Sequence, residues 1–195
     1  MLLNPEELKM ICKPKFQAGK RILAIFVLLG VSPFVSSKLA VSQNPSNSEK
    51  LPVYVKLRGI DGKMYDVADM KGQVVLVSFG ATWCDPCNEE VEALEELKAE
   101  YRDKPVRFIW VSVERKNQVS DSGLRAFSKF HKMSYTVLRD PTQLTYAQFS
   151  MRVRLPLVVF FDRNGKFAGP RHFGMAEPED YKRLMRSQID HLLTS

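Results

Sequence analysis

Residues 74–87 read VVLVSFGATWCDPC, and this stretch decides the fold class. Its first part, Val74–Phe79, is a continuous apolar run, which is typical of a central strand buried on both faces of a sheet. Its last part, Trp83–Cys87, places two cysteines at the junction with the next segment. That segment, Asn88–Tyr101, has apolar residues at helical spacing, so the sequence predicts a strand, a tight turn and a helix.

The two cysteines of this turn, Cys84 and Cys87, are spaced to form a reversible disulfide. Cys84 is expected at the start of the helix, where unpaired N–H groups and the helix dipole stabilise a thiolate. Cys87 lies one turn further on, and Pro86 between them has no N–H to leave unpaired. The same spacing also fits half of a zinc site or an inert pair, but zinc needs two more ligands. Redox exchange is the stronger interpretation, because no pair at ligand spacing exists among the histidines, His131, His172 and His191.

Alternating patterns and turn signals predict the other strands. A β-hairpin is expected first, with strands at Leu51–Leu57 and Met64–Val67 around a turn at Gly59–Gly62. Further strands are expected at Val106–Val113, Thr136–Arg139, Leu157–Phe161 and Lys166–Ala168.

Capping residues and apolar spacing predict three more helices. Asp121 is expected to cap a helix that runs through His131, and Asp140-Pro141 to open one that runs to about Phe149. Pro178 is expected to start the last helix, whose helical spacing is carried by Tyr181, Leu184, Met185, Gln188 and Leu192. This order predicts an α/β fold with a central mixed sheet and helices on both faces.

Composition excludes several classes of protein. With 45% hydrophobic and 26% charged residues, the chain can build a globular core and is not disordered. The formal net charge is +7, but residues 1–37 hold five of the basic and two of the acidic residues, which leaves +4 for the rest. Those bases are scattered among acids, as in Lys98–Asp103, so no nucleic-acid partner is expected.

The first 41 residues are expected to be a signal peptide or a membrane anchor. Ile22–Ser37 is sixteen residues long without a charge, and a basic stretch, Lys13–Arg21, precedes it. This order of charges directs the following chain out of the cytoplasm. Cleavage near Ser37 and retention as an anchor of the inner membrane both remain open. Residues 42–50, rich in Ser, Asn and Pro, are expected to be a flexible linker to a domain at 51–195.

Outside the pair at 84 and 87, the chain has one further cysteine, Cys12, which lies ahead of the apolar run. The exported part therefore has no disulfide framework, and its fold depends on its core.

The chain resembles the thioredoxin superfamily and, within it, the TlpA/ResA-like thiol–disulfide oxidoreductases of the cell envelope. The resemblance covers about residues 51–193 and rests on Met70–Phe79, Ala81–Cys87, Leu155-Pro156 before an apolar strand, and Asn164–Lys166. It implies a thioredoxin-like fold with an added N-terminal hairpin. No cofactor and no metal are expected.

The resemblance also implies roles for single residues. Pro156 would be a cis-proline that faces the cysteines, and the backbone of Leu155 would pair with an extended substrate, beside Trp83 and Pro86. Glu90 matches a glutamate that affects the cysteine pKa values in ResA-like proteins, and its alternative role is an exposed residue that stabilises the first turn of the helix.

Four features depart from the family pattern, one of which is that Val91-Glu92 lacks the proline that often follows the family glutamate. Ser78 stands in place of a buried aspartate, so that proton carrier is absent. Gly80 replaces an aromatic residue and is expected to open the surface beside Trp83. Leu157 replaces the threonine that usually follows the cis-proline.

The sequence favours a reductase over an oxidase. The Asp85 carboxylate opposes a second negative charge on Cys84, and Glu90 adds to this effect if it is close. Destabilising the thiolate makes the dithiol form more reducing. We therefore expect Cys84 to attack client disulfides and Cys87 to resolve the mixed disulfide. By resemblance, a membrane thiol donor of the DsbD/CcdA kind would supply electrons, and apocytochrome c is one expected client.

Three alternatives remain beside this interpretation. A thiol oxidase or isomerase would use the same cysteines, and a non-catalytic thioredoxin-fold binding module would leave them idle. A peroxidase fits poorly, because Thr82 lies two positions before Cys84, where peroxiredoxins have a threonine three positions before their cysteine.

Overall fold

The computed structural model describes residues 53–195. The expectations for the leader, the linker, Cys12 and the start of the first strand at Leu51 lie outside the described residues. Within residues 53–195, no helix has both the length and the apolar character that a membrane span requires.

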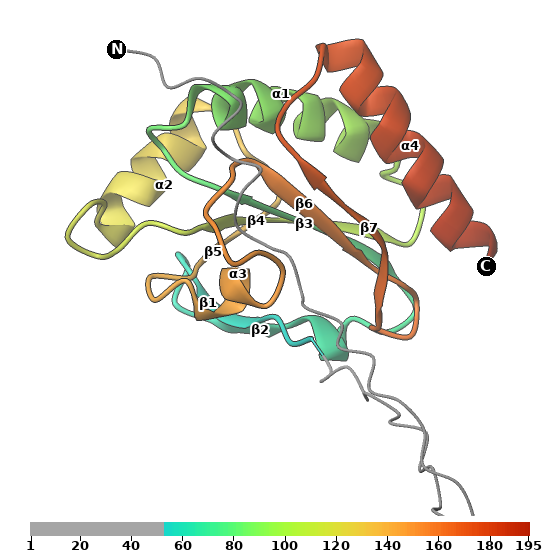
Figure 1. Ribbon diagram of the computed structural model, residues 1–195, viewed down its shortest axis with the longest axis horizontal. Helices are drawn as coiled ribbons and strands as arrows, with labels where there is room; N and C mark the ends of the chain where they lie inside the picture. Colours follow the sequence, from blue (N-terminus) through green and yellow to red (C-terminus); the bar gives the residue numbers. More distant parts are fainter. Residues whose placement is uncertain (1–52) are drawn as a thin grey trace, which may run out of the picture. The chain divides into compact units, whose positions relative to one another are not determined.

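Seven strands form one mixed sheet (Figure 1). Their order across the sheet is β2-β1-β5-β4-β3-β6-β7. Strands β3, β4 and β5 run parallel, whereas β6 and β1 join them antiparallel. The strands are β1 (Lys56–Gly59), β2 (Met64–Asp66), β3 (Val74–Gly80), β4 (Val106–Ser112), β5 (Thr136–Arg139), β6 (Leu157–Phe161) and β7 (Phe167–Phe173).

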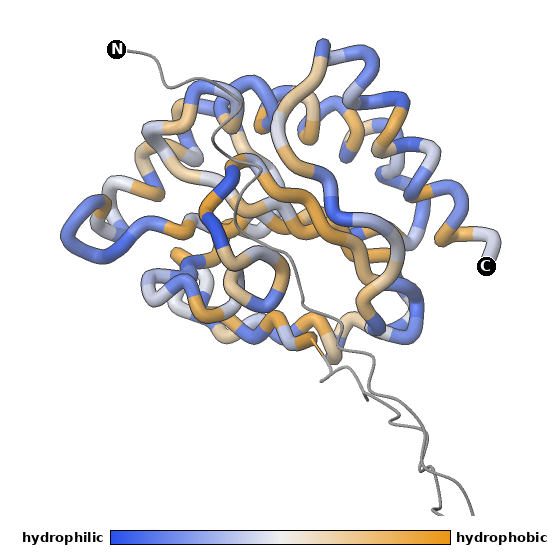
Figure 2. Tube along the Cα trace, viewed as in Figure 1, coloured by the Kyte–Doolittle hydropathy of each residue, from blue (hydrophilic) through white to orange (hydrophobic). Residues whose placement is uncertain are grey.

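Strand β3 lies between β4 and β6, and all seven of its residues are buried. It pairs in parallel with β4 from Val74 opposite Val106 to Gly80 opposite Ser112. Figure 2 shows the hydrophobic residues gathered along these central strands. The apolar run in the sequence therefore forms the central strand, as predicted.

The predicted hairpin is confirmed, and it forms the edge of the sheet opposite β7. Strands β1 and β2 pair antiparallel, and β1 also pairs with β5 through Arg58 and Gly59. The first strand begins at Lys56, later than expected, and a single 3-10 turn, η2 (Val67–Asp69), follows β2.

Helices cover both faces of the sheet, but unequally. The long helices α1 (Asp85–Glu100), α2 (Asp121–Phe130) and α4 (Pro178–Thr194) pack on one face, against side chains such as Leu76 and Trp110. The other face is covered by the residues that flank the hairpin, Val55 and Val67, and by the segment around the one-turn helix α3 (Leu144–Ala147). The redox motif starts α1, on the more heavily covered face (Figure 1).

Two helix predictions, those for α2 and α3, are wrong in detail because Asp121 and Asp140 bind residues outside the first turn of the expected helix. Ser120, not Asp121, is the N-cap of α2, and its hydroxyl accepts the Gly123 N–H. Asp121 instead forms an ion pair with the buried Arg139 of β5.

The helix expected over Asp140–Phe149 is reduced to the single turn α3. Gln143 has a φ of 59°, in the left-handed region that helices exclude, and it separates Pro141 from this turn. The Asp140 carboxylate accepts the Tyr146 N–H at 2.8 Å and so fixes the irregular segment.

Two predictions near the C-terminus also change. Strand β7 runs to Phe173, well past the expected end at Ala168, although Pro170 lies within it. An edge strand tolerates proline because one side of it makes no ladder hydrogen bonds. The last helix begins at Pro178 as predicted, but Leu184 on it is 46% exposed, and Ile189 is buried with Tyr181 and Met185 instead.

Candidate redox site

The two cysteines lie where the central strand β3 passes into helix α1. Cys84 is the N-cap residue of α1, and its carbonyl accepts the N–H groups of Cys87 and Asn88 at 2.9 and 3.1 Å. Cys84 and Cys87 are joined by a disulfide, with their Cα atoms 5.2 Å apart. Pro86 lies in the first turn, where its missing N–H leaves nothing unpaired.

The two sulfur-bearing residues differ in their access to solvent. Cys84 is 6% exposed and Cys87 is fully buried. Trp83, directly before the pair, is 62% exposed, and Pro86 is also exposed. A partner can therefore approach Cys84 past the exposed indole of Trp83, whereas Cys87 is shielded from solvent and from partners.

The segment before β6 meets the cysteines from another part of the chain. The Leu155–Pro156 peptide bond is cis, as the resemblance implied. Leu155 packs against the cluster formed by Ala81, Cys84 and Cys87. The structure thus brings Leu155 to the disulfide, while its role in substrate pairing stays a prediction.

Glu90 is fully buried and lies one turn after Cys87 on the same helix. Its carboxylate accepts hydrogen bonds from the Ser78 hydroxyl of β3 at 2.5 Å and from the Tyr181 hydroxyl of α4 at 2.7 Å. Burial away from water raises the pKa of Glu90 to about 7, although both hydroxyls favour the charged form. The alternative role, an exposed residue of the first turn, is therefore wrong.

The departures at positions 78 and 80 have different consequences from those expected. The loss of an aspartate at Ser78 does not leave the interior without a carboxylate, because Glu90 reaches the Ser78 hydroxyl from α1. Gly80 does not open the surface, since it is buried and a Cβ there would lie 2.8 Å from the Trp110 ring. The Trp110 indole takes that space.

Two residues of this site were not predicted from the sequence. Tyr181 was expected only as an apolar position of the last helix, yet its hydroxyl binds Glu90. Glu114 follows β4, is 2% exposed, and binds the turn before Cys84 through Thr82. An acidic residue directly after a buried strand was the available signal for Glu114, because parallel neighbouring strands end at the same edge of a sheet.

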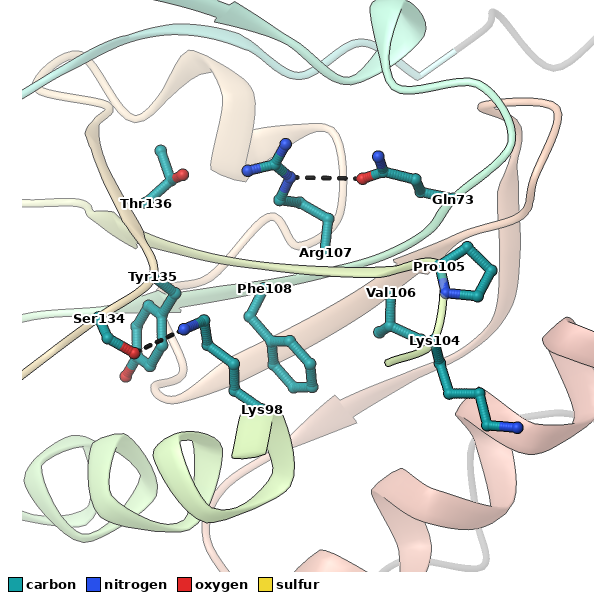
Figure 3. A pocket seen from close by; sticks show the side chains of 10 residues that line it. All are labelled: Gln73, Lys98, Lys104, Pro105, Val106, Arg107, Phe108, Ser134, Tyr135 and Thr136. Carbon is teal, nitrogen blue, oxygen red and sulfur yellow. Dashed lines mark hydrogen bonds between the residues drawn. The ribbon is translucent and has the colours of Figure 1, made fainter. Parts of the chain in front are cut away.

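The pocket in Figure 3 belongs to the opposite end of the sheet. It is lined by Pro105 and Val106 at the start of β4, whereas Cys84 follows the end of the parallel strand β3. Its Lys98 ammonium donates to the Ser134 hydroxyl at 2.6 Å. This pocket is therefore no part of the redox site.

Comparisons with known proteins agree with this geometry. The Redoxin family matches residues 46–169. The thioredoxin-like protein YneN of Bacillus subtilis is 36% identical over 86 residues, which cover 43% of this chain and 48% of YneN. The thiol-disulfide oxidoreductase ResA of Bacillus cereus is 24% identical over 148 residues, which cover 75% of this chain and 82% of ResA.

A solved structure extends the likeness to the fold. A Chlorobium tepidum protein with the provisional name thiol:disulfide interchange protein DsbE superposes with a TM-score of 0.62 at 26% identity. The match covers 73% of this chain and 95% of the other. The chain therefore belongs to the Redoxin family, within the thioredoxin superfamily, and is a thiol–disulfide oxidoreductase similar to the ResA proteins.

Proposed function

We propose that the chain is an extracytoplasmic reductase of client disulfides, in which Cys84 attacks and Cys87 resolves. The observation that carries the roles of the two cysteines is the asymmetry of the pair. Cys84 caps α1 beside the exposed Trp83, whereas Cys87 is fully buried one turn inside the helix. A thiolate at a helix start is stabilised by the dipole, so the outer cysteine is the suited nucleophile.

The proposed exchange transfers two electrons to the client. The Cys84 thiolate attacks one sulfur of the client disulfide, and the other client sulfur leaves as a thiolate. The Cys87 thiol then loses its proton, and its sulfur attacks the Cys84 sulfur of the mixed disulfide. The second client sulfur leaves, the client is a dithiol, and the Cys84–Cys87 disulfide described above is formed.

Glu90 is our candidate for the group that takes the proton of Cys87. Residues three positions apart on a helix are neighbours on its surface, and both side chains are buried. The pKa of Glu90, raised by burial to about 7, matches that of a base that works near neutral pH. We assign it this role in the resolving step.

The charges around the pair support the proposed direction of electron flow. Asp85 is exposed in the first turn of α1, and Glu90 is buried one turn after Cys87 on the same helix. Both carboxylates oppose a thiolate, which favours the disulfide and makes the dithiol a stronger reductant. An oxidase such as DsbA needs the opposite arrangement, in which the thiolate is stabilised.

Trapping of mixed disulfides tests the assigned roles. Cys87→Ser should accumulate mixed disulfides with client proteins, because the resolving sulfur is gone, whereas Cys84→Ser should trap few. Equal trapping by both variants, or by neither, would contradict the roles. The reduction potential, measured against glutathione, should lie well below the value of about −120 mV typical of DsbA. A potential near that value would favour an oxidase or isomerase.

The location and the partners are further parts of the proposal. The charge order of residues 1–37 supports export, and a disulfide reductase in an oxidising compartment needs electrons from the cytoplasm. A membrane dithiol donor of the DsbD/CcdA kind fits this need, and apocytochrome c is a candidate client. A fusion of residues 1–50 to a reporter that is active only outside the cytoplasm should be positive, and an inactive fusion would contradict export.

A further inference from the structure

A second buried carboxylate, Glu114, lies on the strand side of the redox site. It is 2% exposed, and no ion pair within residues 53–195 involves it. A buried carboxylate without a cation needs several hydrogen bonds to offset the loss of water. Glu114 has three, from the Thr82 N–H at 2.9 Å, the Thr82 hydroxyl at 2.7 Å and the Ser112 hydroxyl at 3.1 Å.

Two of these three bonds hold one residue of the turn that precedes the cysteines. The turn is closed by the Cys84 N–H, which donates to the Ala81 carbonyl at 3.1 Å. Thr82 is half-buried and faces Glu114, whereas its neighbour Trp83 is exposed. Fixing Thr82 through both its backbone and its side chain therefore fixes the direction in which Trp83 and Cys84 leave the turn.

The contact also extends the pairing of β3 and β4 beyond the ends of the two strands. The Val113 N–H donates to the Gly80 carbonyl at 3.0 Å, and Glu114 then binds Thr82 two residues further along. The loop is thus tied to the rigid centre of the sheet, which positions reactive groups better than a free loop does.

We propose that Glu114 is a positioning residue for thiol–disulfide exchange, which holds the turn Ala81–Cys84 through Thr82 when the disulfide is open. The proposal rests on the proposed function, in which Cys84 attacks. In the oxidised protein the bond to Cys87 itself restrains Cys84. Reduction removes that restraint, and the Glu114–Thr82 contact then keeps the Cys84 sulfur at the start of α1.

The contact requires hydrogen-bonding groups at position 114 rather than a negative charge. An amide oxygen in Glu114→Gln can accept the Thr82 N–H, and the amide NH2 can donate to the Thr82 hydroxyl, which accepts as well as donates. Glu114→Ala removes every one of these bonds. Thr82→Val removes the hydroxyl bond alone and leaves the backbone bond in place, while Thr82→Ser keeps both.

The test measures the attack of Cys84 on a small disulfide, 5,5′-dithiobis(2-nitrobenzoate). The full chain with Cys12→Ser and Cys87→Ser has Cys84 as its one thiol. In this parent, Glu114→Ala should lower the second-order rate constant about tenfold to hundredfold, as small misplacements of a reacting group do. Glu114→Gln should recover most of that loss. Thr82→Val should lose less than Glu114→Ala, and Thr82→Ser should recover the parent rate.

Two measurements distinguish a structural role from a positioning role: the rate of the double variant Thr82→Val with Glu114→Ala, and the melting temperature of Thr82→Val. Thr82→Val should add nothing to Glu114→Ala, because the hydroxyl then has no partner. In the cysteine-containing oxidised protein, Thr82→Val should melt within a few degrees of the parent while its reduced form attacks slowly. If Glu114→Ala does not fold, the pair Thr82→Val and Thr82→Ser still decides the question.

The possible failures are distinguishable. Equal rates for Thr82→Val and Thr82→Ser, or additive losses in the double variant, would overturn the positioning role while leaving the proposed function intact. A parent protein that does not react at all would overturn the proposed function, and the positioning role with it.

Discussion

Glu90 and Glu114 are both buried carboxylates of the redox site, but they accept hydrogen bonds from different kinds of group. Glu90 accepts from two side-chain hydroxyls, Ser78 and Tyr181, which can turn to donate or accept. Glu114 accepts from a backbone N–H as well as from the hydroxyls of Thr82 and Ser112, and a backbone N–H only donates.

This difference separates the two roles. Hydroxyl partners can adapt when Glu90 gains or loses a proton, so its network permits titration. The fixed N–H of Thr82 requires an acceptor at Glu114 in every state of the cycle. We infer that charge matters at position 90 and that hydrogen-bond geometry matters at position 114.

The largest effect is expected in the pH dependence of stability. The pKa of Glu90 is raised by burial from about 4.5 to about 7, so the folded state binds this proton more tightly than the unfolded state does. The stability that results is complete below about pH 4.5 and is lost as the pH rises to about 7, by about 3 kcal/mol. Glu90→Gln should abolish this part of the loss.

Urea unfolding of the oxidised protein between pH 4 and 8 measures this loss, because the bonded cysteines do not titrate. Asp140 and His172 also have shifted pKa values, so the difference between Glu90→Gln and wild type is the informative quantity. A difference that stays constant across this range would show that Glu90 does not titrate there.

The next effect is expected at Tyr181. Tyr181→Phe removes a hydroxyl that donates to the Glu90 carboxylate, and a hydrogen bond to a charged group contributes about 2 kcal/mol. The loss should be larger at pH 8, where Glu90 is ionised, than at pH 5, where it is protonated. Tyr101→Phe is the matched control, because that hydroxyl donates to the exposed Asp190 at 2.8 Å. An equal loss at both pH values would contradict the role of Tyr181 as a partner of the charged form.

The contrast between the two glutamates also shows which features of the site could be predicted from the sequence. A single sequence shows local patterns. Three features of this site are of that kind: the apolar run of β3, the turn with the cysteines and the match at Glu90. Glu114 and Thr82 are 32 residues apart, and they meet because β3 and β4 are parallel neighbours. No fixed spacing in the sequence reports this contact, and the available signal, an acidic residue directly after a buried strand, does not name Thr82 as its partner.

The same reason accounts for the errors elsewhere in the fold. Ser120 and Asp121 are both good capping residues, and the choice between them depends on Arg139, which lies on a strand far along the chain. The role of Gly80 was inferred from the motif alone. The position requires a residue without a side chain because Trp110 on the neighbouring strand occupies the space. Local propensity left these choices open, and tertiary contacts decided them.

A smaller effect is expected in the reduction potential. Removing the negative charge of Glu90 should favour the Cys84 and Cys87 thiolates, so Glu90→Gln should make the pair more oxidising at pH 8. A shift of about 30–40 mV corresponds to roughly 1.4–1.9 kcal/mol in a two-electron couple. At pH 5, where Glu90 is protonated in the wild type, the two proteins should have nearly the same potential. Glu114→Gln should shift the potential less than Glu90→Gln at pH 8, and a larger shift would reverse the contrast between the two residues.

The smallest effect is expected at the exposed carboxylate of Asp85, which lies next to Cys84 in the first turn of α1. Solvent screens a charge at this position, and an exposed pair of charges interacts by about 1 kcal/mol in water. Asp85→Asn should therefore make the couple more oxidising by only about 20–30 mV. Unlike the shift at Glu90, this one should shrink when the ionic strength is raised, because salt screens exposed charges more than buried ones. Equilibration with glutathione at low and high salt measures both properties. A shift toward more reducing potentials would mean that Asp85 stabilises the thiolate, and it would remove one of the two charges on which the reductase assignment rests.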